Sequence, residues 1–358
     1  MYDLFTSRKR ILITGGAGFI GGTLTRRLLR ETKSKIYNID KLGYASDLIG
    51  INQTLKDHII DESRYKFLHI DLEDFQATKN AIKISDPDFV FHLAAESHVD
   101  RSIYNPEIFL KSNIIGTFNL LENLRIHWQS LEPKRKKDFR ILHISTDEVF
   151  GSLDTESDQF DEKTPYNPRN PYSASKAAAD HIARSWFHTF GLPVTVTNCS
   201  NNYGPWQYPE KLIPVTILMA AQKKNIPLYG NGLNIRDWLF VEDHIDALLL
   251  ASSKGSPGKT YCIGGMEEKN NKNVVEDICK IMDSKHPHNM PHSKLIKFVE
   301  DRKGHDKRYS INPELISREL GWERKHKFEE GLNLTVNWYL ENLDWCEKVI
   351  RNNKQINI

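Results

Sequence analysis

The stretch ILITGGAGFIGG, residues 11–22, decides the fold of this chain. A short β-branched run is followed by Gly15, Gly18 and Gly21 and then by an amphipathic pattern, which predicts a strand, a tight turn and a helix. Glycines let such a turn bring backbone amides close to a phosphate at the helix N-terminus, where the helix dipole favours negative charge. Asp40 ends the next predicted strand, as expected of a dinucleotide-binding site.

Asp40 also indicates which dinucleotide the site would hold. An aspartate at this position accepts hydrogen bonds from the adenosine ribose and repels a 2′-phosphate, so it favours NAD over NADP. The neighbouring Lys41 works slightly against that preference. The alternative is a plain tight turn with a strand-end aspartate, and the order of strand, turn and helix argues against it.

Further β-branched runs alternate with amphipathic stretches along the first half of the chain. They cover residues 35–40, 65–71, 89–95, 139–146 and 193–200. Strands that alternate with helices predict βαβ units, and therefore an α/β fold with a doubly wound parallel Rossmann sheet. Ligands bind beyond the carboxyl ends of the strands in such folds.

The pattern becomes irregular after residue 200, which predicts a smaller C-terminal α/β substrate-binding lobe. The runs 236–243 and 259–265 read as isolated short strands. We expect an NAD-binding Rossmann domain over residues 9–200, with segment 240–252 as a further candidate to pack on it. The substrate-binding lobe then covers residues 201–345.

Composition excludes several classes of protein. The chain has 358 residues, 39% hydrophobic and 27% charged, which is typical of a globular protein. Its net charge is only +2, so no global field favours nucleic acid or a membrane surface. We interpret the basic run 133–137 as a solvated loop, and we expect neither nucleic-acid nor membrane partners.

Cysteine and histidine usage points to a reducing compartment and to no metal. The four cysteines show no CxxC spacing, so we expect free thiols. The N-terminus lacks the apolar stretch of a signal peptide, and no apolar run approaches roughly 20 residues, so we expect a cytoplasmic protein. His286 and His288 have no companion cysteines or spaced carboxylates, and we expect no metal site.

Two residues that could form a catalytic general base, Tyr172 and Lys176, follow the predicted dinucleotide site in the sequence. Tyr172 and Lys176 are four residues apart, so they share one face of a helix. The lysine cation and the Thr146 hydroxyl would lower the pKa of the phenol and make it a general base for a secondary alcohol. The same spacing also arises by chance on a surface helix, and the dinucleotide motif upstream favours the catalytic interpretation.

Asp147 and Glu148, at the end of a predicted strand, add a second acid/base pair. Removing water from a sugar needs a base for an acidified C–H bond and an acid for the departing hydroxyl, and two carboxyls can divide these roles. Adjacent strand residues point to opposite faces, so both can serve only if the chain curls there. The alternative is a helix N-cap or a solvated turn.

These motifs together resemble the extended short-chain dehydrogenase/reductase family and, more closely, the dTDP-glucose 4,6-dehydratases within it. The resemblance covers residues 9–340. It rests on ITGGAGFIG, LAAESHVDRSI, STDEVFG, YSASK, TNCSNNYGPWQYPEKLIP, RDWLFVEDH and DRKGHD. It implies a lyase of nucleotide-sugar metabolism and deoxysugar biosynthesis that converts dTDP-glucose to dTDP-4-keto-6-deoxyglucose and water. NAD would stay tightly bound and be regenerated in each turnover.

The resemblance also implies residue roles. Tyr172 takes the C4 hydroxyl proton while NAD accepts the hydride, Glu148 removes the C5 proton, and Asp147 protonates the leaving C6 hydroxyl. The cofactor would contact Gly15, Gly18, Phe19, Ile20, Gly21, Asp40, Lys41, Leu42, Asp71, Leu72, Ala94, Ala95, Glu96, Ser97, His98, Ser112, Tyr172, Lys176 and Asn202. The substrate would contact Ser97, Thr146, Asn201, Lys211, Leu212, Pro227, Leu228, Tyr229, Arg236, Asn271, Asp301, Arg302, Lys303, Gly304 and His305.

Arg236 makes independent chemical sense, because a guanidinium binds diphosphate oxygens in bidentate fashion. It could equally be half of an ion pair with Asp237.

Three other functions stay open at this point. A 4,6-dehydratase of a UDP-, CDP- or GDP-sugar would use the same groups, and a nucleotide-sugar 4-epimerase would use Tyr172 and Lys176 but has no role for the carboxyl pair. A non-catalytic NAD-binding sensor needs neither set. The resemblance further implies a homodimer that pairs helices near 107–128 and 172–190 into a four-helix bundle.

Overall fold

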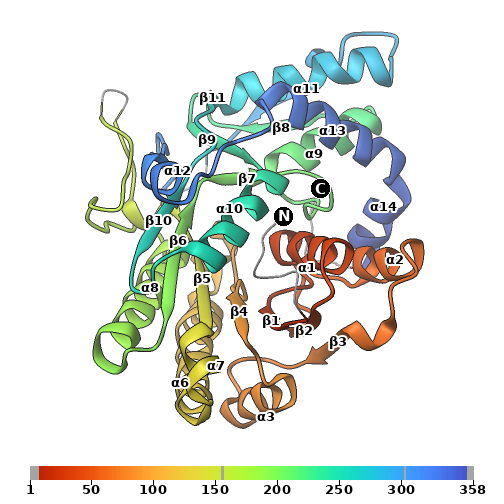
Figure 1. Ribbon diagram of the computed structural model, residues 1–358. Helices are drawn as coiled ribbons and strands as arrows, with labels where there is room; N and C mark the ends of the chain where they lie inside the picture. Colours follow the sequence, from red (N-terminus) through yellow and green to blue (C-terminus); the bar gives the residue numbers. More distant parts are fainter. Residues whose placement is uncertain (1–7, 155–156, 302–303, 353–358) are drawn as a thin grey trace.

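The computed structural model describes residues 8–154, 157–301 and 304–352 (Figure 1). Its centre is a seven-stranded sheet in the order β10-β6-β5-β4-β1-β2-β3, with every neighbouring pair parallel. The strands are β1 (Arg10–Thr14), β2 (Lys35–Asp40), β3 (Tyr65–His69), β4 (Phe89–His92), β5 (Arg140–Thr146), β6 (Val194–Cys199) and β10 (Thr260–Ile263). The predicted doubly wound parallel sheet is therefore confirmed.

Helices cover both faces of this sheet (Figure 1). Those of the Rossmann part are α1 (Phe19–Glu31), α2 (Ile49–Asp57), α3 (Phe75–Ser85), α4 (Val99–Tyr104), α5 (Pro106–Phe109), the π-helical η3 (Leu110–Ile115), α6 (Gly116–Ser130), α7 (Pro133–Asp138), the 3₁₀ turn η4 (Asp147–Phe150), α8 (Pro171–Phe190), α10 (Val241–Lys254) and α12 (Glu314–Leu320). A further 3₁₀ turn, η2 (Glu62–Arg64), precedes β3.

The alternation of side chains along each strand explains the two layers. Ile11 and Ile13 of β1 pack in one core with α1, α2, α10 and α12. Leu12, which points to the opposite face, packs in a second core with α3, α6 and α8. Because both faces are covered, the strands are apolar almost throughout, as is usual for parallel sheets.

A smaller lobe lies beyond the carboxyl end of the sheet and has its own apolar core. It holds a three-stranded sheet, β11-β9-β7, and a two-stranded sheet, β12-β8. Its elements are β7 (Asn201–Tyr203), α9 (Leu212–Ala221), β8 (Ile226–Tyr229), β9 (Ile235–Phe240), β11 (Glu268–Asn270), α11 (Asn271–Lys285), η5 (His292–Leu295), β12 (Ile296–Val299), α13 (Phe328–Glu341) and α14 (Leu343–Asn352). No helix in the described part of the chain is both long and apolar enough to cross a membrane.

Three local predictions were wrong. The run 259–265 is not an isolated strand, because β10 pairs with β6 at the edge of the main sheet. The run 236–243 is not isolated either, since β9 pairs with β7 and β11. The basic run 133–137 forms the short helix α7, begun by Pro133, and Arg135 within it pairs with Asp86 and Asp88. Partners distant in sequence decide the two strand pairings and the contacts of Arg135, whereas Pro133 at the first turn is a local signal for α7 that the sequence analysis overlooked.

Candidate active site

The glycine turn has the geometry that its sequence predicts. Gly15 adopts a φ of +72°, and a Cβ there would lie 2.6 Å from the backbone nitrogen of Ala94. A Cβ on Gly21 would collide with the carbonyl oxygen of Gly15, so only glycine lets α1 pack this closely on the turn. The N-cap of α1, Gly18, makes no side-chain hydrogen bond, so no cap side chain covers the first amides of the helix. The turn therefore fits a pyrophosphate.

Asp40 stands at the end of β2 and braces this turn. Its carboxylate accepts hydrogen bonds from the backbone nitrogen of Ala17 at 3.0 Å and of Leu42 at 2.8 Å. Burial raises the pKa of Asp40, and these two hydrogen bonds oppose the rise. Lys41, one residue further on, places its ammonium 3.2 Å from a carboxylate oxygen of Glu96 and 3.8 Å from one of Asp71.

The other predicted cofactor residues lie on segments that follow neighbouring strands. Asp71 and Leu72 follow β3, and residues 94–98 follow β4, where the backbone nitrogen of Glu96 donates to Asn113 of η3 at 2.8 Å. Ser112 is buried on the same π-helical turn. In a parallel sheet these ends meet at one edge, so the structure brings the set together around the glycine turn.

The chain curls at the end of β5, as the adjacent carboxyls require. The strand ends at Thr146, and the 3₁₀ turn η4 begins at Asp147. The Thr146 hydroxyl accepts a hydrogen bond from the backbone nitrogen of Glu148 at 3.2 Å and donates to Asp147 at 3.3 Å. Thr146 is therefore both the cap of this turn and a polar group next to the two carboxyls.

Asp147 is a buried carboxyl with an unusual environment. Its side chain is 1% exposed, and its Oδ2 atom has no hydrogen-bond partner among the described residues. Burial raises its pKa well above the ordinary value, the charges of Glu148 and Asp237 raise it further, and Arg236 opposes the rise. Asp147 therefore holds its proton readily, as a general acid must.

Tyr172 and Lys176 share a face of α8, and both are buried. The Lys176 ammonium donates a hydrogen bond to the Ile144 carbonyl at 2.8 Å. Burial raises the pKa of Tyr172 well above its ordinary value, Glu148 raises it further, and the Thr146 hydroxyl opposes the rise. The direction is opposite to our prediction, because burial and the neighbouring carboxyl outweigh the groups expected to lower the pKa.

Arg236 reaches the same region from β9 in the lobe. It is 5% exposed, donates to the carbonyl of Asp306 at 3.0 Å, and lies over the ring of Tyr309, 4.3 Å from its centroid. The carboxylate of Asp237 instead accepts from the backbone nitrogens of Gly265 at 3.0 Å and Glu267 at 2.8 Å. These bonds account for Asp237 without an ion pair to its neighbour.

The remaining predicted substrate residues come from the lobe and its connections. Asn201 and Asn202 lie on β7, Lys211 directly precedes α9, and Asn271 begins α11. The other described members are Leu212, Pro227, Leu228, Tyr229, Asp301, Gly304 and His305. Ser97 follows β4 and is exposed. Arg302 and Lys303 lie outside the described residues.

Sequence reasoning missed several polar residues next to the site. Asp306 and Tyr309 hydrogen-bond to each other and support Arg236. Asp180 lies one helical turn beyond Lys176, and its position four residues on was a readable signal. Asp306 ends the DRKGHD motif, which was a readable signal, whereas no signal marked Tyr309, because its partner Arg236 is about 70 residues away. In the described parts of the chain, no group of three or more His, Cys, Asp or Glu residues could hold a metal ion.

A glycine turn after β1, an aspartate ending β2 and a buried tyrosine and lysine on one helix face are, together, the site of an NAD-dependent enzyme of the extended short-chain dehydrogenase/reductase class. Residues 12–335 match the family model described as GDP-mannose 4,6 dehydratase. A dTDP-glucose 4,6-dehydratase of Shigella flexneri is 49% identical over 348 residues, covering 95% of each chain. The chain therefore belongs to this dehydratase family, among the dTDP-glucose 4,6-dehydratases.

Solved structures agree with this assignment. The dTDP-glucose 4,6-dehydratase from Bacillus anthracis in complex with NAD is 40% identical, with a TM-score of 0.82 over 95% of this chain and 99% of the other. The dTDP-glucose 4,6-dehydratase from Streptomyces venezuelae with NAD and TYD bound is 37% identical, with a TM-score of 0.85 over the same shares.

Proposed function

We propose that this protein is an NAD-dependent hydro-lyase that converts dTDP-glucose to dTDP-4-keto-6-deoxyglucose and water. The observation that carries the proposal is the second acid/base pair beside the tyrosine. Asp147 is buried next to Glu148, and burial and the charge of Glu148 raise its pKa, which favours the protonated form. Simple alcohol oxidation or 4-epimerisation has no use for such a pair, whereas elimination of water needs one group to take a proton and another to give one.

Three side chains of the protein carry out the proton transfers of the reaction. Tyr172 takes the proton of the C4 hydroxyl, and the resulting 4-ketone makes the C5 hydrogen acidic. Glu148 removes that hydrogen as a proton, and Asp147 gives its proton to the departing C6 hydroxyl, so water leaves and a C5–C6 double bond forms. Glu148 then returns its proton to C5 when C6 is reduced. NAD, when bound at the glycine turn, supplies reversible oxidation, first at C4 and then in reverse at C6. No net oxidation occurs, so the protein needs no external reductant.

The substrate is recognised across the two parts of the protein. Arg236 is positioned by Asp306 and Tyr309, and its guanidinium would bind the diphosphate. Asn201, Lys211, Tyr229, Asn271, Asp301 and His305 are proposed to enclose the nucleotide, and Ser97 and Thr146 to contact the hexose. The predicted boundary between the NAD-binding part (9–200) and the nucleotide-sugar lobe (201–345) stays a prediction, since β10 and α10 of the later segment belong to the main sheet and its core.

The decisive experiment is incubation of the purified protein with dTDP-glucose and, in parallel, with UDP-glucose and GDP-mannose. Mass spectrometry should show loss of one water from dTDP-glucose without added reductant. Faster loss of water from UDP-glucose or GDP-mannose would show that the protein prefers that nucleotide sugar as its substrate. An unchanged mass with a galactose product would indicate a 4-epimerase, and no reaction on any donor would favour the NAD-binding sensor.

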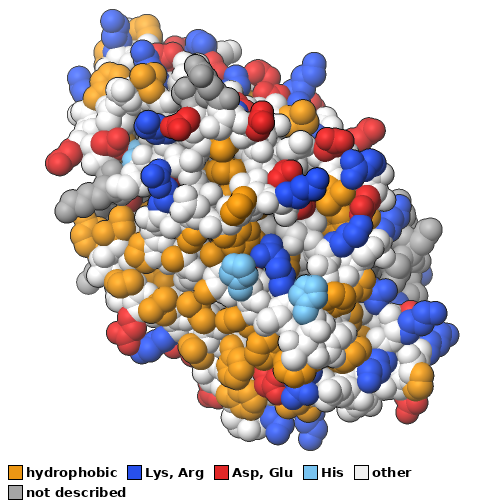
Figure 2. All heavy atoms as spheres, turned by 90° about the vertical axis from the view of Figure 1, so that its left-hand side faces the viewer, with side chains coloured by type: hydrophobic (Ala, Val, Ile, Leu, Met, Phe, Trp, Pro, Cys, Tyr) orange, Lys and Arg blue, Asp and Glu red, His pale blue; other side chains and the backbone are white. Residues whose placement is uncertain are grey.

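We further propose a homodimer, supported by the apolar surface of the helices that cover one face of the sheet. Ile115, Phe118 and Ile126 are 48%, 38% and 46% exposed around α6, and Phe190 at the end of α8 is 42% exposed. Hydrophobic side chains gather over the part of the surface where these helices lie (Figure 2). Sedimentation velocity should give twice the chain mass, and Phe118→Glu should shift it toward the monomer.

We propose a cytoplasmic location. Its support is that the four cysteines are free and buried. Fractionation of cells that make the protein from its own gene would test it.

A further inference from the structure

A stripe of four functional side chains runs along α8 from the active site into the protein. Tyr172, Lys176, Asp180 and Arg184 are each four residues apart and therefore share one helix face. The proposed function uses only the first two. Asp180 is 0% exposed, and a buried carboxyl requires partners that stabilise it.

Asp180 is held from three directions. His143 of β5, also 0% exposed, places its Nε2 atom 2.9 Å from one carboxylate oxygen. The other oxygen accepts a hydrogen bond from the Tyr166 hydroxyl at 2.8 Å and from the Asn198 amide at 3.3 Å. The Asn198 amide also donates to the Thr146 carbonyl at 3.0 Å. The network therefore connects Asp180 to the strand end that carries the acid/base residues.

The proton in the His143 and Asp180 pair can be assigned from the contacts. An anionic carboxylate can only accept, so the Nε2 atom of His143 donates. Its Nδ1 atom is buried and has no hydrogen-bond partner among the described residues, and burial lowers the pKa of His143. The pKa of Asp180 is lowered: burial raises it, but the hydrogen bond from His143, together with the positive charges of Lys176 and Arg184, outweighs that effect. His143 therefore stays neutral and Asp180 stays negatively charged.

Lys176 is a buried cation one helical turn before Asp180 on the same face of α8, and the charge of Asp180 acts on it. It is 5% exposed, and its ammonium bonds to a neutral carbonyl, that of Ile144. A buried ammonium is unstable unless a negative charge lies near it. We propose that Asp180 is the positioning residue of the active site, the counter-charge that keeps Lys176 protonated, with His143, Tyr166 and Asn198 holding its carboxylate in place. The role rests on the proposed function, because it serves the Tyr172 base.

Other charged and titratable groups around the pair act in known directions. Burial lowers the pKa of Lys176, and Asp180 and then Cys199 of β6 oppose the fall. Arg184 donates to the Tyr166 hydroxyl at 2.6 Å and helps keep Asp180 ionised. His92 of β4 lies beside His143, and burial lowers its pKa well below the ordinary value, so it adds no charge. Glu148 and Asp147, near Tyr172, act on the phenol rather than on Asp180.

The test is the alkaline limb of the pH profile of kcat, where loss of the Lys176 proton ends activity. Asp180 raises the pKa of Lys176, so Asp180→Asn should move this limb to lower pH by about one unit or more. Asp180→Glu should restore its position. Asp88→Asn, the same change of a carboxylate to an amide but next to Arg10 and Arg135, is the matched control and should leave the limb in place. An unmoved limb in Asp180→Asn would overturn the proposal.

A second variant and a direct titration of Lys176 complete the test. If Asp180→Asn does not fold, the double change His143→Met with Asp180→Leu removes the pair together and should give the same shift. NMR on protein with isotope-labelled lysine follows the titration of Lys176. It reports the protonation state of this residue without any turnover. A wild type that dehydrates no nucleotide sugar would defeat the proposed function alone, whereas an unchanged Lys176 titration in the variant would defeat this inference alone.

Discussion

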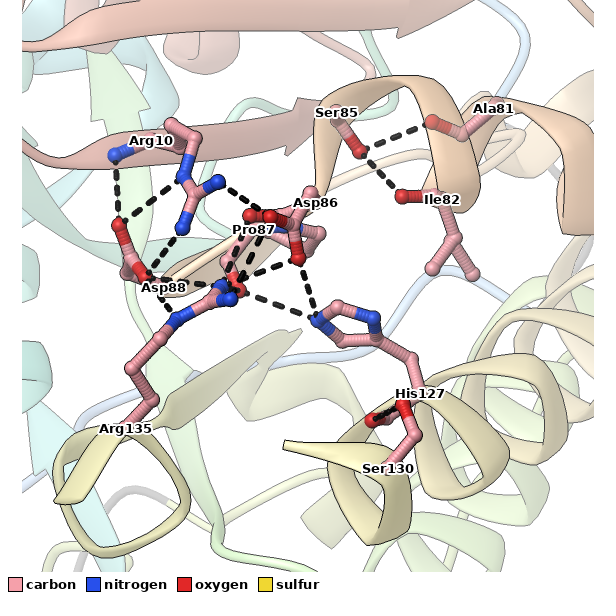
Figure 3. Close-up of polar contacts among 10 residues, drawn as sticks. All are labelled: Arg10, Ala81, Ile82, Ser85, Asp86, Pro87, Asp88, His127, Ser130 and Arg135. Carbon is pink, nitrogen blue, oxygen red and sulfur yellow. Dashed lines mark hydrogen bonds and ion pairs between the residues drawn. The ribbon is translucent and has the colours of Figure 1, made fainter. Parts of the chain in front are cut away.

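The two ends of the central sheet use the same kinds of residue in opposite ways. At the amino ends of β1 and β4, Asp86 and Asp88 lie among Arg10, Arg135 and His127 (Figure 3). Asp88 accepts from the backbone nitrogen of Arg10 at 3.0 Å and from the Arg135 guanidinium at 3.1 Å. Burial raises its pKa, but the hydrogen bonds and charge of Arg10 outweigh burial, and the pKa is lowered.

At the carboxyl ends, burial outweighs the groups that would stabilise the negative charge of Asp147 and Asp237. One oxygen of Asp147 has no hydrogen-bond partner among the residues that the structure describes, and burial and the charge of Glu148 raise the pKa of this carboxyl. Burial also raises the pKa of Asp237 to about 6. The comparison teaches that one end of the sheet uses charge to stabilise the fold, whereas the other holds proton-transfer groups at a cost in stability. Each prediction below tests that division.

The largest effect should come from Tyr172→Phe, which removes the base at the carboxyl end. Loss of a general base typically costs about a thousandfold in rate, so reduction of bound NAD by dTDP-glucose in a single turnover should nearly vanish. Stopped-flow absorbance of NADH measures this step directly. Undiminished NADH formation would contradict the role of Tyr172.

Glu148→Gln should have the next largest effect and should separate the steps. We expect loss of water to slow by about a hundredfold while C4 oxidation is partly retained, because Glu148 acts after oxidation. Reduced cofactor should then accumulate during turnover, which rapid-quench sampling with mass spectrometry can follow. Normal product at the wild-type rate would remove Glu148 from the mechanism.

Asp147→Asn should stabilise the protein while damaging catalysis. The folded-state pKa of this acid is raised, so wild-type stability falls as pH increases from the unfolded value of about 4 toward the folded value. Removing the carboxyl should increase the free energy of unfolding at neutral pH by about 1–2 kcal/mol. Urea unfolding of both proteins at neutral pH measures it, and a destabilised variant would argue against the proposed division.

Asp88→Asn is the matched change at the amino end and should have the smallest effect, with the opposite sign. Its pKa is lowered on folding, so its stabilisation is present above about pH 4 and is lost as pH falls through the folded value. We expect a loss of about 1 kcal/mol at neutral pH, allowing for solvent screening of a partly exposed pair. Activity should not change, and a large loss of kcat would show that the two ends are coupled.

The sequence was a good guide wherever a local pattern carried the information. The glycine turn, Asp40, the strand at 35–40 and the spacing of Tyr172 and Lys176 all depend on neighbouring residues, and the structure places them as predicted. The curl at Asp147 was required by two adjacent carboxyls acting together, and η4 supplies it. The roles of these residues stay proposals until the variants are measured.

Only the tertiary structure decided the features that depend on distant partners. It placed β10 in the main sheet, paired Arg135 with Asp86 and Asp88, and brought Asp306 and Tyr309 into contact with Arg236. It also reversed the expected direction of the Tyr172 pKa, because burial and the Glu148 charge are set by packing. Local sequence fixes backbone conformation and spacing, whereas desolvation and charge pairing depend on which distant segments meet, so only the fold determines them.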